Sequence, residues 1–172
     1  MPKNLEIKAR IQSIERSISV ARSLGASNEG ELHQTDTYFE VDNGRLKLRE
    51  INQTQAELIY YHRIENETQR LSNFEIYPCR DPQRLKELLK QSIGIKAVVA
   101  KKRILYIYES TRIHIDNVEH LGAFIEFEAP VIDSEDIARR TIDFLAGKFE
   151  IHPKDYVIQS YIDLVLERII AK

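Results

Sequence analysis

The architecture of this chain is clearest in the segment Asp42-Asn-Gly-Arg-Leu-Lys-Leu-Arg-Glu50, a tight turn followed by a strand with two different faces. The dipeptide Asn-Gly is a strong signal for a β-hairpin, because the turn needs residues that tolerate positive φ angles. After the turn, Arg45, Lys47 and Arg49 alternate with leucines, and successive side chains of a strand point to opposite faces. The segment therefore predicts a hairpin strand with one cationic face and one apolar face.

The same alternation of charged and apolar residues recurs along the chain. Its charged positions elsewhere are Glu6 and Lys8, then Lys101 and Arg103, then Arg112, His114 and Asp116, and finally Glu126 and Glu128. An antiparallel sheet often leaves one face in water, so these residues can form a solvated face. However, cations on neighbouring strands repel one another unless an anion lies between them. The alternative is a closed barrel whose interior carries the charges and holds an anionic ligand.

Hydrophobic periodicity and turn residues predict about eight strands and three or four helices. The strands are expected at about 4–11, 33–41, from 45 onward, 57–63, 71–77, 96–109, 111–118 and 123–129. The helices are expected at about 13–24, from Pro82 to about 91, from Ser134 onward, and from His152-Pro153 to about 169. Most strands follow one another through short turns, which indicates an antiparallel α+β domain whose helices cover the apolar face of the sheet.

Length and composition restrict the class of protein. With 172 residues, of which 42% are hydrophobic, the chain can form one globular domain, which we expect to span residues 1–172. The net charge of −2 lacks the basic excess of a protein that binds nucleic acid non-specifically. There is no membrane-spanning apolar run and no signal region, so we expect a cytoplasmic protein without a membrane partner. The oligomeric state stays open, with a dimer among the options.

The charged positions suit a polyanion held together with a metal ion. Paired carboxylates such as Glu126 and Glu128 bind Mg²⁺ or Mn²⁺ and leave coordination positions for water and phosphate oxygens. Arginine grips phosphate oxygens with two hydrogen bonds, and lysine acts as a movable point charge. His114 is in phase with Arg112 and Asp116, so a position in a tunnel and a structural hydrogen bond are equally compatible with its spacing. The residues therefore predict a site for a polyanion and a divalent ion.

Seven blocks of sequence, spread from one end of the chain to the other, match a known superfamily in combination. They are Asn-Leu-Glu-Ile-Lys-Ala-Arg at 4–10, Gln-Thr-Asp-Thr-Tyr-Phe at 34–39, Gly-Arg-Leu-Lys-Leu-Arg-Glu at 44–50, Lys-Lys-Arg at 101–103, Arg-Ile-His-Ile-Asp at 112–116, Val-Glu-His-Leu-Gly-Ala-Phe-Ile-Glu-Phe-Glu at 118–128, and Ser-Tyr-Ile-Asp-Leu at 160–164. Together they resemble the CYTH superfamily, the triphosphate tunnel metalloenzymes, and within it the branch that includes class IV adenylyl cyclases.

The resemblance implies an eight-stranded antiparallel closed β-barrel, with helices packed outside and a tunnel for a triphosphate with Mg²⁺ or Mn²⁺. By this resemblance the acids that bind the metal are Glu6, Asp116, Glu126 and Glu128. The cations that bind the triphosphate are Lys8, Arg45, Lys47, Arg49, Lys101, Arg103 and Arg112, with Arg63 and Arg70 at positions where further tunnel cations are expected. The expected catalytic residues are Lys8, Lys101, Arg103 and Arg112.

The first strand departs from the pattern of the superfamily at one position. The opening signature of the superfamily is Glu-x-Glu-x-Lys, and here Asn4 stands in place of the first glutamate. Asparagine can coordinate a metal through its side-chain oxygen, but it lacks the negative charge of glutamate. The substitution leaves open the affinity for the metal and the position of a second ion.

Three functions are compatible with the sequence. The leading one is an adenylyl cyclase-like enzyme, in which the ribose 3′-hydroxyl of ATP attacks the α-phosphorus and pyrophosphate leaves. The second is a triphosphatase that directs water at a terminal phosphorus of inorganic triphosphate or of an organic triphosphate, thiamine triphosphate included. The third is a module that binds a triphosphate or polyphosphate without turnover, which Asn4 keeps open. The charged residues serve all three functions.

Overall fold

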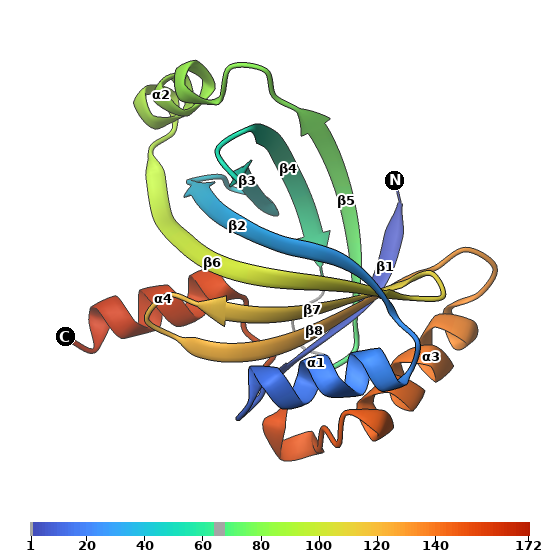
Figure 1. Ribbon diagram of the computed structural model, residues 1–172. Coiled ribbons are helices and arrows are strands. Elements are labelled where there is room, and N and C mark those ends of the chain that lie inside the picture. Colours follow the sequence, from blue (N-terminus) through green and yellow to red (C-terminus); the bar gives the residue numbers. More distant parts are fainter. Residues whose placement is uncertain (1, 64–67) are drawn as a thin grey trace.

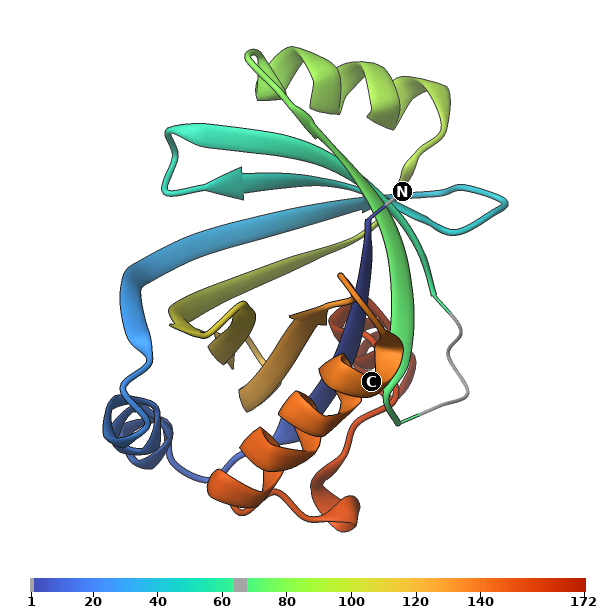
Figure 2. The same cartoon turned by 90° about the vertical axis from the view of Figure 1, so that its right-hand side faces the viewer.

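The computed structural model describes residues 2–63 and 68–172, with Arg63 described by its backbone alone. Within these residues, eight strands form a closed barrel with four helices around it (Figure 1, Figure 2). The strands are β1 (Lys3–Arg10), β2 (Ser27–Phe39), β3 (Arg45–Ile51), β4 (Gln55–Arg63), β5 (Arg70–Pro78), β6 (Ile95–Tyr108), β7 (Thr111–Val118) and β8 (Gly122–Pro130). The helices are α1 (Ile14–Ser23), α2 (Pro82–Ser92), α3 (Glu135–Lys148) and α4 (Tyr161–Ile170).

The strands follow the order β1-β5-β4-β3-β2-β6-β7-β8 around the barrel, and neighbouring strands are antiparallel. The pairing of β1 with both β5 and β8 closes the circle. A closed barrel has no free sheet edge, so each strand finds backbone partners on both sides. This architecture confirms the predicted α+β fold with a closed eight-stranded antiparallel barrel. It excludes the alternative of an open sheet with a solvated charged face.

The hairpin between β2 and β3 depends on Gly44. This residue has a φ of +65°, and a Cβ atom at this position would lie 2.7 Å from the hydroxyl of Tyr60. Glycine alone meets both conditions without strain. The turn sets the register in which Asp36 lies opposite Arg49. The predicted two-faced strand thereby enters the barrel with its cationic face inward.

Helices α1, α2 and α3 cover the outward apolar faces of the strands. α1 and α3 pack on β1, β7 and β8, with α3 lying beside β1 in Figure 2, and α2 packs on β2 and β3. Ile7 and Phe127 on the strands and Ile142 and Leu145 on α3 are almost fully buried in this layer. Each such side chain contributes about 1.5–3 kcal/mol to the free energy of folding. The apolar faces therefore point toward the helices, and the charged faces are left inside the barrel.

One end of the barrel is closed by the segment 157–163, which includes the start of α4. The hydroxyl of Ser160 accepts a hydrogen bond from the backbone N–H of Asp163 at 3.4 Å, and the Asp163 carboxylate accepts one from the backbone N–H of Ser160 at 3.0 Å. This reciprocal capping fixes the first turn of the helix. Tyr161 then packs edge-on against Phe124 inside the barrel, with ring centroids 5.1 Å apart. The ring of Tyr161 therefore forms the floor of the charged interior at this end of the barrel.

Two predicted boundaries are wrong. The helix expected from Pro153 begins at Tyr161, because the capping sequence at Ser160 is the stronger start signal and residues 153–155 form only a short 3₁₀ turn. The strand expected from His33 begins at Ser27. Its first residues are polar and exposed, so they lack the alternation that marks a half-buried strand, and pairing with β6 determines their conformation.

Candidate functional site

The charged strand faces enclose a cavity of about 280 Å³ inside the barrel. Its cationic lining residues are Lys8, Lys47, Arg49, Lys101, Arg103 and Arg112. Its acidic lining residues are Glu6, Glu57, Glu126 and Glu128, accompanied by Asn4 and His114. Burying charge is costly unless each group finds a counter-charge or hydrogen bonds. The pairing of these groups therefore determines what the cavity can hold.

Asp36 of β2 orients three cations on one wall of the cavity. Lys47 and Lys101 donate to its Oδ2 at 3.0 and 3.1 Å, and Arg49 donates to both carboxylate oxygens at 2.7 and 2.8 Å. Burial alone would raise the pKa of Asp36, but the charges of Arg49, Lys101 and Lys47 hold it well below its usual range. One negative charge thus faces three positive ones. The excess of positive charge suits an anionic ligand.

A second wall is ordered around Asp116 of β7. Arg103 donates to both of its oxygens at 2.7 Å, and the hydroxyl of Tyr161 donates to Oδ2 at 2.7 Å. Burial opposes ionisation, yet the adjacent Arg103 lowers the pKa of Asp116 below its ordinary value. Because both oxygens are held, Asp116 positions Arg103 rather than offering a ligand atom to an ion. The metal role that the resemblance implies for Asp116 stays a prediction, and this geometry does not favour it.

Sequence reasoning missed two residues that shape the site, Asp36 and Tyr161. Tyr161 lies at the closed end, with the ammonium groups of Lys8 and Lys101 at 4.2 and 5.5 Å from its ring centre. Aromatic faces attract cations at such distances. The hairpin register places Asp36 opposite Arg49, and from this register Asp36 could have been predicted as a site residue. No signal placed Tyr161, because its position depends on how α4 meets the barrel.

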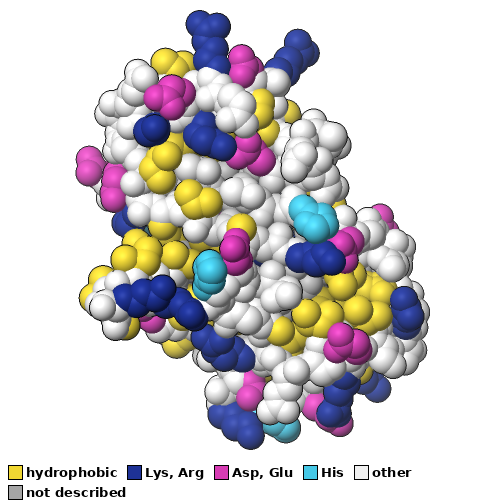
Figure 3. Space-filling view, turned by 60° about the vertical axis from the view of Figure 1, so that its left-hand side comes forward, with side chains coloured by type: hydrophobic (Ala, Val, Ile, Leu, Met, Phe, Trp, Pro, Cys, Tyr) yellow, Lys and Arg dark blue, Asp and Glu magenta, His cyan; other side chains and the backbone are white. Residues whose placement is uncertain are grey.

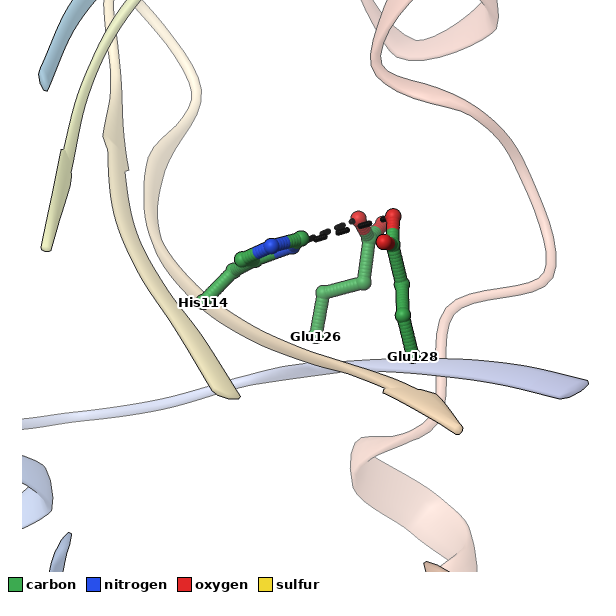
Figure 4. A group of neighbouring side chains, drawn as sticks. All are labelled: His114, Glu126 and Glu128. Atoms are coloured by element: carbon green, nitrogen blue, oxygen red, sulfur yellow. Dashed lines mark hydrogen bonds and ion pairs between the residues drawn. The ribbon is translucent and has the colours of Figure 1, made fainter. Parts of the chain in front are cut away.

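Three side chains, His114, Glu126 and Glu128, form a group that could hold a metal ion (Figure 4). One candidate ligand atom of each lies within 4.8 Å of the others. The Nδ1 atom of His114 is 3.4 Å from Glu126 and 3.8 Å from Glu128. The two glutamates occupy alternate positions of β8, and His114 lies opposite Glu126 in the β7–β8 register. The strand pairing therefore brings an imidazole and two carboxylates to one point of the cavity.

Cations also surround these two carboxylates. Lys8 and Arg103 lie 3.5 Å from Glu126, and Arg112 lies 3.8 Å from Glu128. Burial alone would raise the pKa of Glu126, but Lys8, the contact with His114 and Arg103 together hold it well below its usual range. Glu126 is therefore ionised at neutral pH. The same cations lie within reach of any phosphate that approaches a metal ion at this point.

Glu6 and Asn4 line the same cavity but do not belong to the group of His114, Glu126 and Glu128. The backbone of Glu6 lies opposite Glu128 in the β1–β8 register. Asn4 is half-buried two residues before it. The structure thus brings two of the predicted metal-binding acids together and places a third, Glu6, in the same cavity. Their metal role stays a prediction.

Two of the predicted triphosphate-binding cations, Arg45 and Arg70, do not line this cavity in the structure. Arg45 lines a separate pocket at the closed end, where it donates to Asp163 at 2.9 Å and to the hydroxyl of Ser160. Arg70 is almost fully buried and donates to the backbone carbonyl of Ile158. Arg45 and Arg70 therefore fasten the closing segment 157–163. The side chain of Arg63 lies outside the described residues.

The protonation of Lys101 predicts a pH dependence of ligand binding. Burial lowers the pKa of Lys101 to about 7. The positive charges of Arg49 and Arg103 act in the same direction, and the negative charge of Asp36 opposes the shift only in part. The ligand-free protein therefore loses this positive charge as the pH rises through about 7. A bound triphosphate stabilises the ammonium form, so binding above this pH takes up a proton. We expect the affinity for tripolyphosphate to fall by up to about fivefold between pH 7 and pH 8.

Titration calorimetry in two buffers of different ionisation enthalpy would measure this proton uptake. Because tripolyphosphate itself titrates, the informative quantity is the difference between the wild type and Lys101→Ala. The exposed neighbour Lys102, which pairs with Glu31 at 3.0 Å, provides the control. Lys102→Ala should retain the full uptake, and an unchanged uptake in Lys101→Ala would contradict the assignment.

The outer surface contrasts with the cavity. On the face shown in Figure 3, basic and acidic side chains are intermixed. The cations of the cavity instead gather inside the barrel around Asp36 and Asp116. Among the described residues, the helices are too short or too polar to cross a lipid bilayer.

Comparison with solved structures shows the same fold in proteins of several organisms. The PH1012 protein of Pyrococcus horikoshii has a TM-score of 0.84 and 25% identity, over 94% of this chain and 98% of that chain. A presumed adenylate cyclase of Vibrio parahaemolyticus has a TM-score of 0.79 and 18% identity, over 95% of this chain and 97% of that chain. HpAC1 of Hippeastrum, a presumed adenylyl cyclase described as revealing a dominant triphosphatase activity, has a TM-score of 0.68 and 14% identity, over 96% and 95%.

A search of curated proteins gives no match to this chain. The family model of the CYTH domain, in contrast, matches residues 2–161, which is nearly the whole chain. This match agrees with the closed antiparallel barrel and with the charged cavity inside it. The chain therefore belongs to the CYTH domain family.

Proposed function

We propose that this protein is a metal-dependent enzyme that binds a nucleoside triphosphate in the barrel cavity and cyclises it, as a class IV adenylyl cyclase converts ATP to cyclic AMP and pyrophosphate. The observation that carries the proposal is one cavity lined by six of the described cationic side chains and by the group of His114, Glu126 and Glu128. A polyanion is the ligand whose negative charge can balance so many clustered cations. Membership of the CYTH family supports a triphosphate as that polyanion.

The cations are already oriented before a ligand arrives. Asp36 holds Arg49 and Lys101, and Asp116 holds Arg103. Side chains that are fixed in advance lose little conformational entropy on binding, and they can stabilise charge that develops on a leaving pyrophosphate without reorganising. The cavity is therefore suited both to bind a triphosphate and to stabilise its cleavage.

The apolar side chains that line part of the cavity favour a nucleotide over inorganic triphosphate. Along β6, the inward positions from the closed end are Val99, Lys101, Arg103 and Leu105. Leu105 lies opposite His114 in the β6–β7 register, and the apolar residues Leu32, Ile51 and Ile76 also line the cavity. Such a surface can pack against a base and a ribose, whereas inorganic triphosphate has no group to place there. This arrangement supports ATP as the substrate of the proposed cyclase.

The residues present fit the metal that this chemistry requires. Glu126 and Glu128, with His114 beside them, would hold a divalent ion next to Lys8 and Arg103. A bound divalent ion neutralises charge that develops on phosphate oxygens during transfer. Lys8 and Arg103 would bind the phosphate oxygens, and the ribose 3′-oxygen would form its bond to the α-phosphorus as pyrophosphate leaves. The charge of pyrophosphate then remains among the cavity cations.

A triphosphatase is the second candidate, and the cavity mouth favours it. The side chain of Arg112 at this mouth is 54% exposed and that of Glu128 is 19% exposed, so water can reach the phosphates from this side. With water in place of the ribose hydroxyl, the same cations would assist hydrolysis of a terminal phosphate.

A product assay separates these functions. ATP, tripolyphosphate and thiamine triphosphate would each be incubated with the purified protein and with Mg²⁺ or Mn²⁺, and cyclic AMP, pyrophosphate and phosphate would be quantified. Equal amounts of cyclic AMP and pyrophosphate from ATP are the expected result. Phosphate without cyclic AMP would show the triphosphatase, and binding without any product would leave a binding module and overturn the proposed enzyme.

Removal of one cavity cation should weaken triphosphate binding. At pH 6, where Lys101 is charged, Lys101→Ala should lower the affinity for tripolyphosphate by about tenfold to a hundredfold, the equivalent of one charge-assisted contact. Calorimetry would measure the affinity, and Lys102→Ala, which removes a neighbouring lysine on the outer face, should leave it unchanged. Equal affinities in both variants would exclude Lys101 from the binding site.

A further inference from the structure

We propose that His114 is a direct metal ligand and that, with Glu126 and Glu128, it makes this centre prefer a transition-metal ion that binds imidazole, such as Co²⁺ or Zn²⁺, over Mg²⁺. The inference rests on the proposed function, because that function requires a divalent ion. It goes further by assigning a third protein ligand and a class of ion.

The three candidate ligand atoms already lie close to the arrangement that one ion requires. Bonds from zinc to imidazole nitrogen and carboxylate oxygen are about 2.0–2.2 Å long, so ligands of a common ion lie up to about 4 Å apart. In the structure the three atoms lie within 4.8 Å of one another, and Nδ1 of His114 is 3.4 and 3.8 Å from the two carboxylates. Small side-chain movements would therefore complete the centre.

A purely structural hydrogen bond explains this geometry less well. Arg103 contacts Asp116 at 2.7 Å, whereas Glu126 has no such short contact with its cations, since Lys8 and Arg103 both lie 3.5 Å from it. His114 lies 3.4 Å from Glu126, beyond the usual 2.7–3.2 Å of an N–H···O bond. It also faces Glu128 at 3.8 Å, so the ring points toward the space between both carboxylates, as Figure 4 shows. A shared ion accounts for both approaches at once.

The charges around the centre favour a neutral third ligand. Lys8 and Arg103 lie 3.5 Å from Glu126 and are needed for the phosphates. A further carboxylate would strengthen metal binding but would also repel an incoming triphosphate. Imidazole adds a ligand without adding negative charge, and Asn4, which lines the same cavity, is also uncharged. The proposed centre therefore combines two carboxylate ligands with one neutral nitrogen ligand.

The nitrogen ligand changes the preferred ion. Mg²⁺ binds oxygen ligands and retains several of its waters, whereas imidazole suits ions such as Zn²⁺. Affinity for mixed nitrogen and oxygen sites rises from Mn²⁺ to Co²⁺ and Zn²⁺. We expect the order Mg²⁺, Mn²⁺, Co²⁺, Zn²⁺ of increasing affinity, with the nitrogen ligand responsible for much of the difference.

Metal titrations of the ligand-free protein test the assignment. His114→Gln should weaken Co²⁺ and Zn²⁺ binding by at least about tenfold and change Mg²⁺ binding by less than about twofold, since glutamine still offers an oxygen. His33→Gln is the matched control, because the exposed His33 lies 3.3 Å from Glu31 and offers only an adventitious surface site. This control should leave every affinity unchanged. Equal losses for Mg²⁺ and Co²⁺ in His114→Gln, or no loss at all, would overturn the proposal.

Electron paramagnetic resonance supplies a readout that a structural role would not affect. Mn²⁺ bound to the wild type should show coupling to a directly bonded nitrogen, and His114→Gln should lack it. If His114→Gln fails to fold, Glu128→Gln provides the second variant: it should weaken binding of all four ions while the nitrogen coupling of residual Mn²⁺ persists. Absence of nitrogen coupling in the wild type would overturn the proposal. None of these measurements uses turnover, so their failure is distinguishable from failure of the product assay.

Discussion

Glu128→Gln should lower metal-dependent turnover by about a hundredfold or more, while the fold and triphosphate binding persist. The substitution keeps the shape of the side chain and removes the charge that would hold the ion next to Glu126. A metal ion contributes several kcal/mol to stabilisation of charge in the transition state, and about 2.7 kcal/mol corresponds to a hundredfold change in rate. Glu128 lies 3.8 Å from both Arg112 and His114, so it makes no short ion pair with either, and its neutralisation should cost little stability.

Steady-state turnover at saturating metal would be measured together with tripolyphosphate affinity in the presence of chelator. The affinity in chelator should stay the same or rise, because one negative charge near the phosphates is gone. Glu119→Gln is the control, since its side chain is 62% exposed on the outer surface. Undiminished activity in Glu128→Gln, or turnover of the wild type with chelator present, would contradict the metal role.

Asp116→Asn should destabilise the folded protein by about 3–5 kcal/mol, because it removes the nearer counter-charge of the buried guanidinium of Arg103 and leaves only Glu126, at 3.5 Å. The carboxylate has no exposed surface and accepts three hydrogen bonds of 2.7 Å from Arg103 and Tyr161. In a chain of this size the loss corresponds to about 6–20 °C in melting temperature. Urea and thermal unfolding would measure it, with the exposed Asp133→Asn expected to stay within about 0.5 kcal/mol. A loss below about 1 kcal/mol would show that Arg103 finds other partners.

The melting temperature of Asp36→Asn should respond to a ligand differently from that of Asp116→Asn. It also removes a buried counter-charge, but the three cations that it releases, Lys47, Arg49 and Lys101, all line the cavity. Tripolyphosphate can replace the lost carboxylate there, so the gain in melting temperature on adding it should exceed that of the wild type. Asp116→Asn releases only one cavity cation, Arg103, so its gain should be smaller than that of Asp36→Asn. Equal gains in Asp36→Asn and Asp116→Asn would contradict the division of the cavity into these two walls.

The strand faces were predictable from sequence because they depend on local alternation. The inward positions of Lys47, Arg103 and Glu126 follow from period-two patterning, and the turn at Gly44 from its dipeptide. Closure into a barrel did not follow from the pattern, which by itself favoured a solvated face. That choice came from the family resemblance, whose blocks cover both strands that close the circle, 3–10 and 122–130.

What the sequence could not predict depends on contacts between distant segments. Arg45 has the same alternation as Lys47, yet it lies beyond the floor formed by Tyr161 and binds Asp163. Its role is determined by where the C-terminal helix meets the barrel, which no local pattern encodes. The contacts of Asp116 also depend on another strand, because Arg103 donates to both of its oxygens, and its metal role stays a prediction.

Closure of the barrel by β1 and β8 also has a consequence for biosynthesis. The strand at residues 3–10 leaves the ribosome before the strand at 122–130, which is one of its two partners. Chains emerge at about 5–20 residues per second, so this edge waits several seconds for its partner while other chains are nearby. Unpaired strand edges are templates for association between chains. A ribosome stalled before residue 122 would hold a sheet with open edges and no binding site.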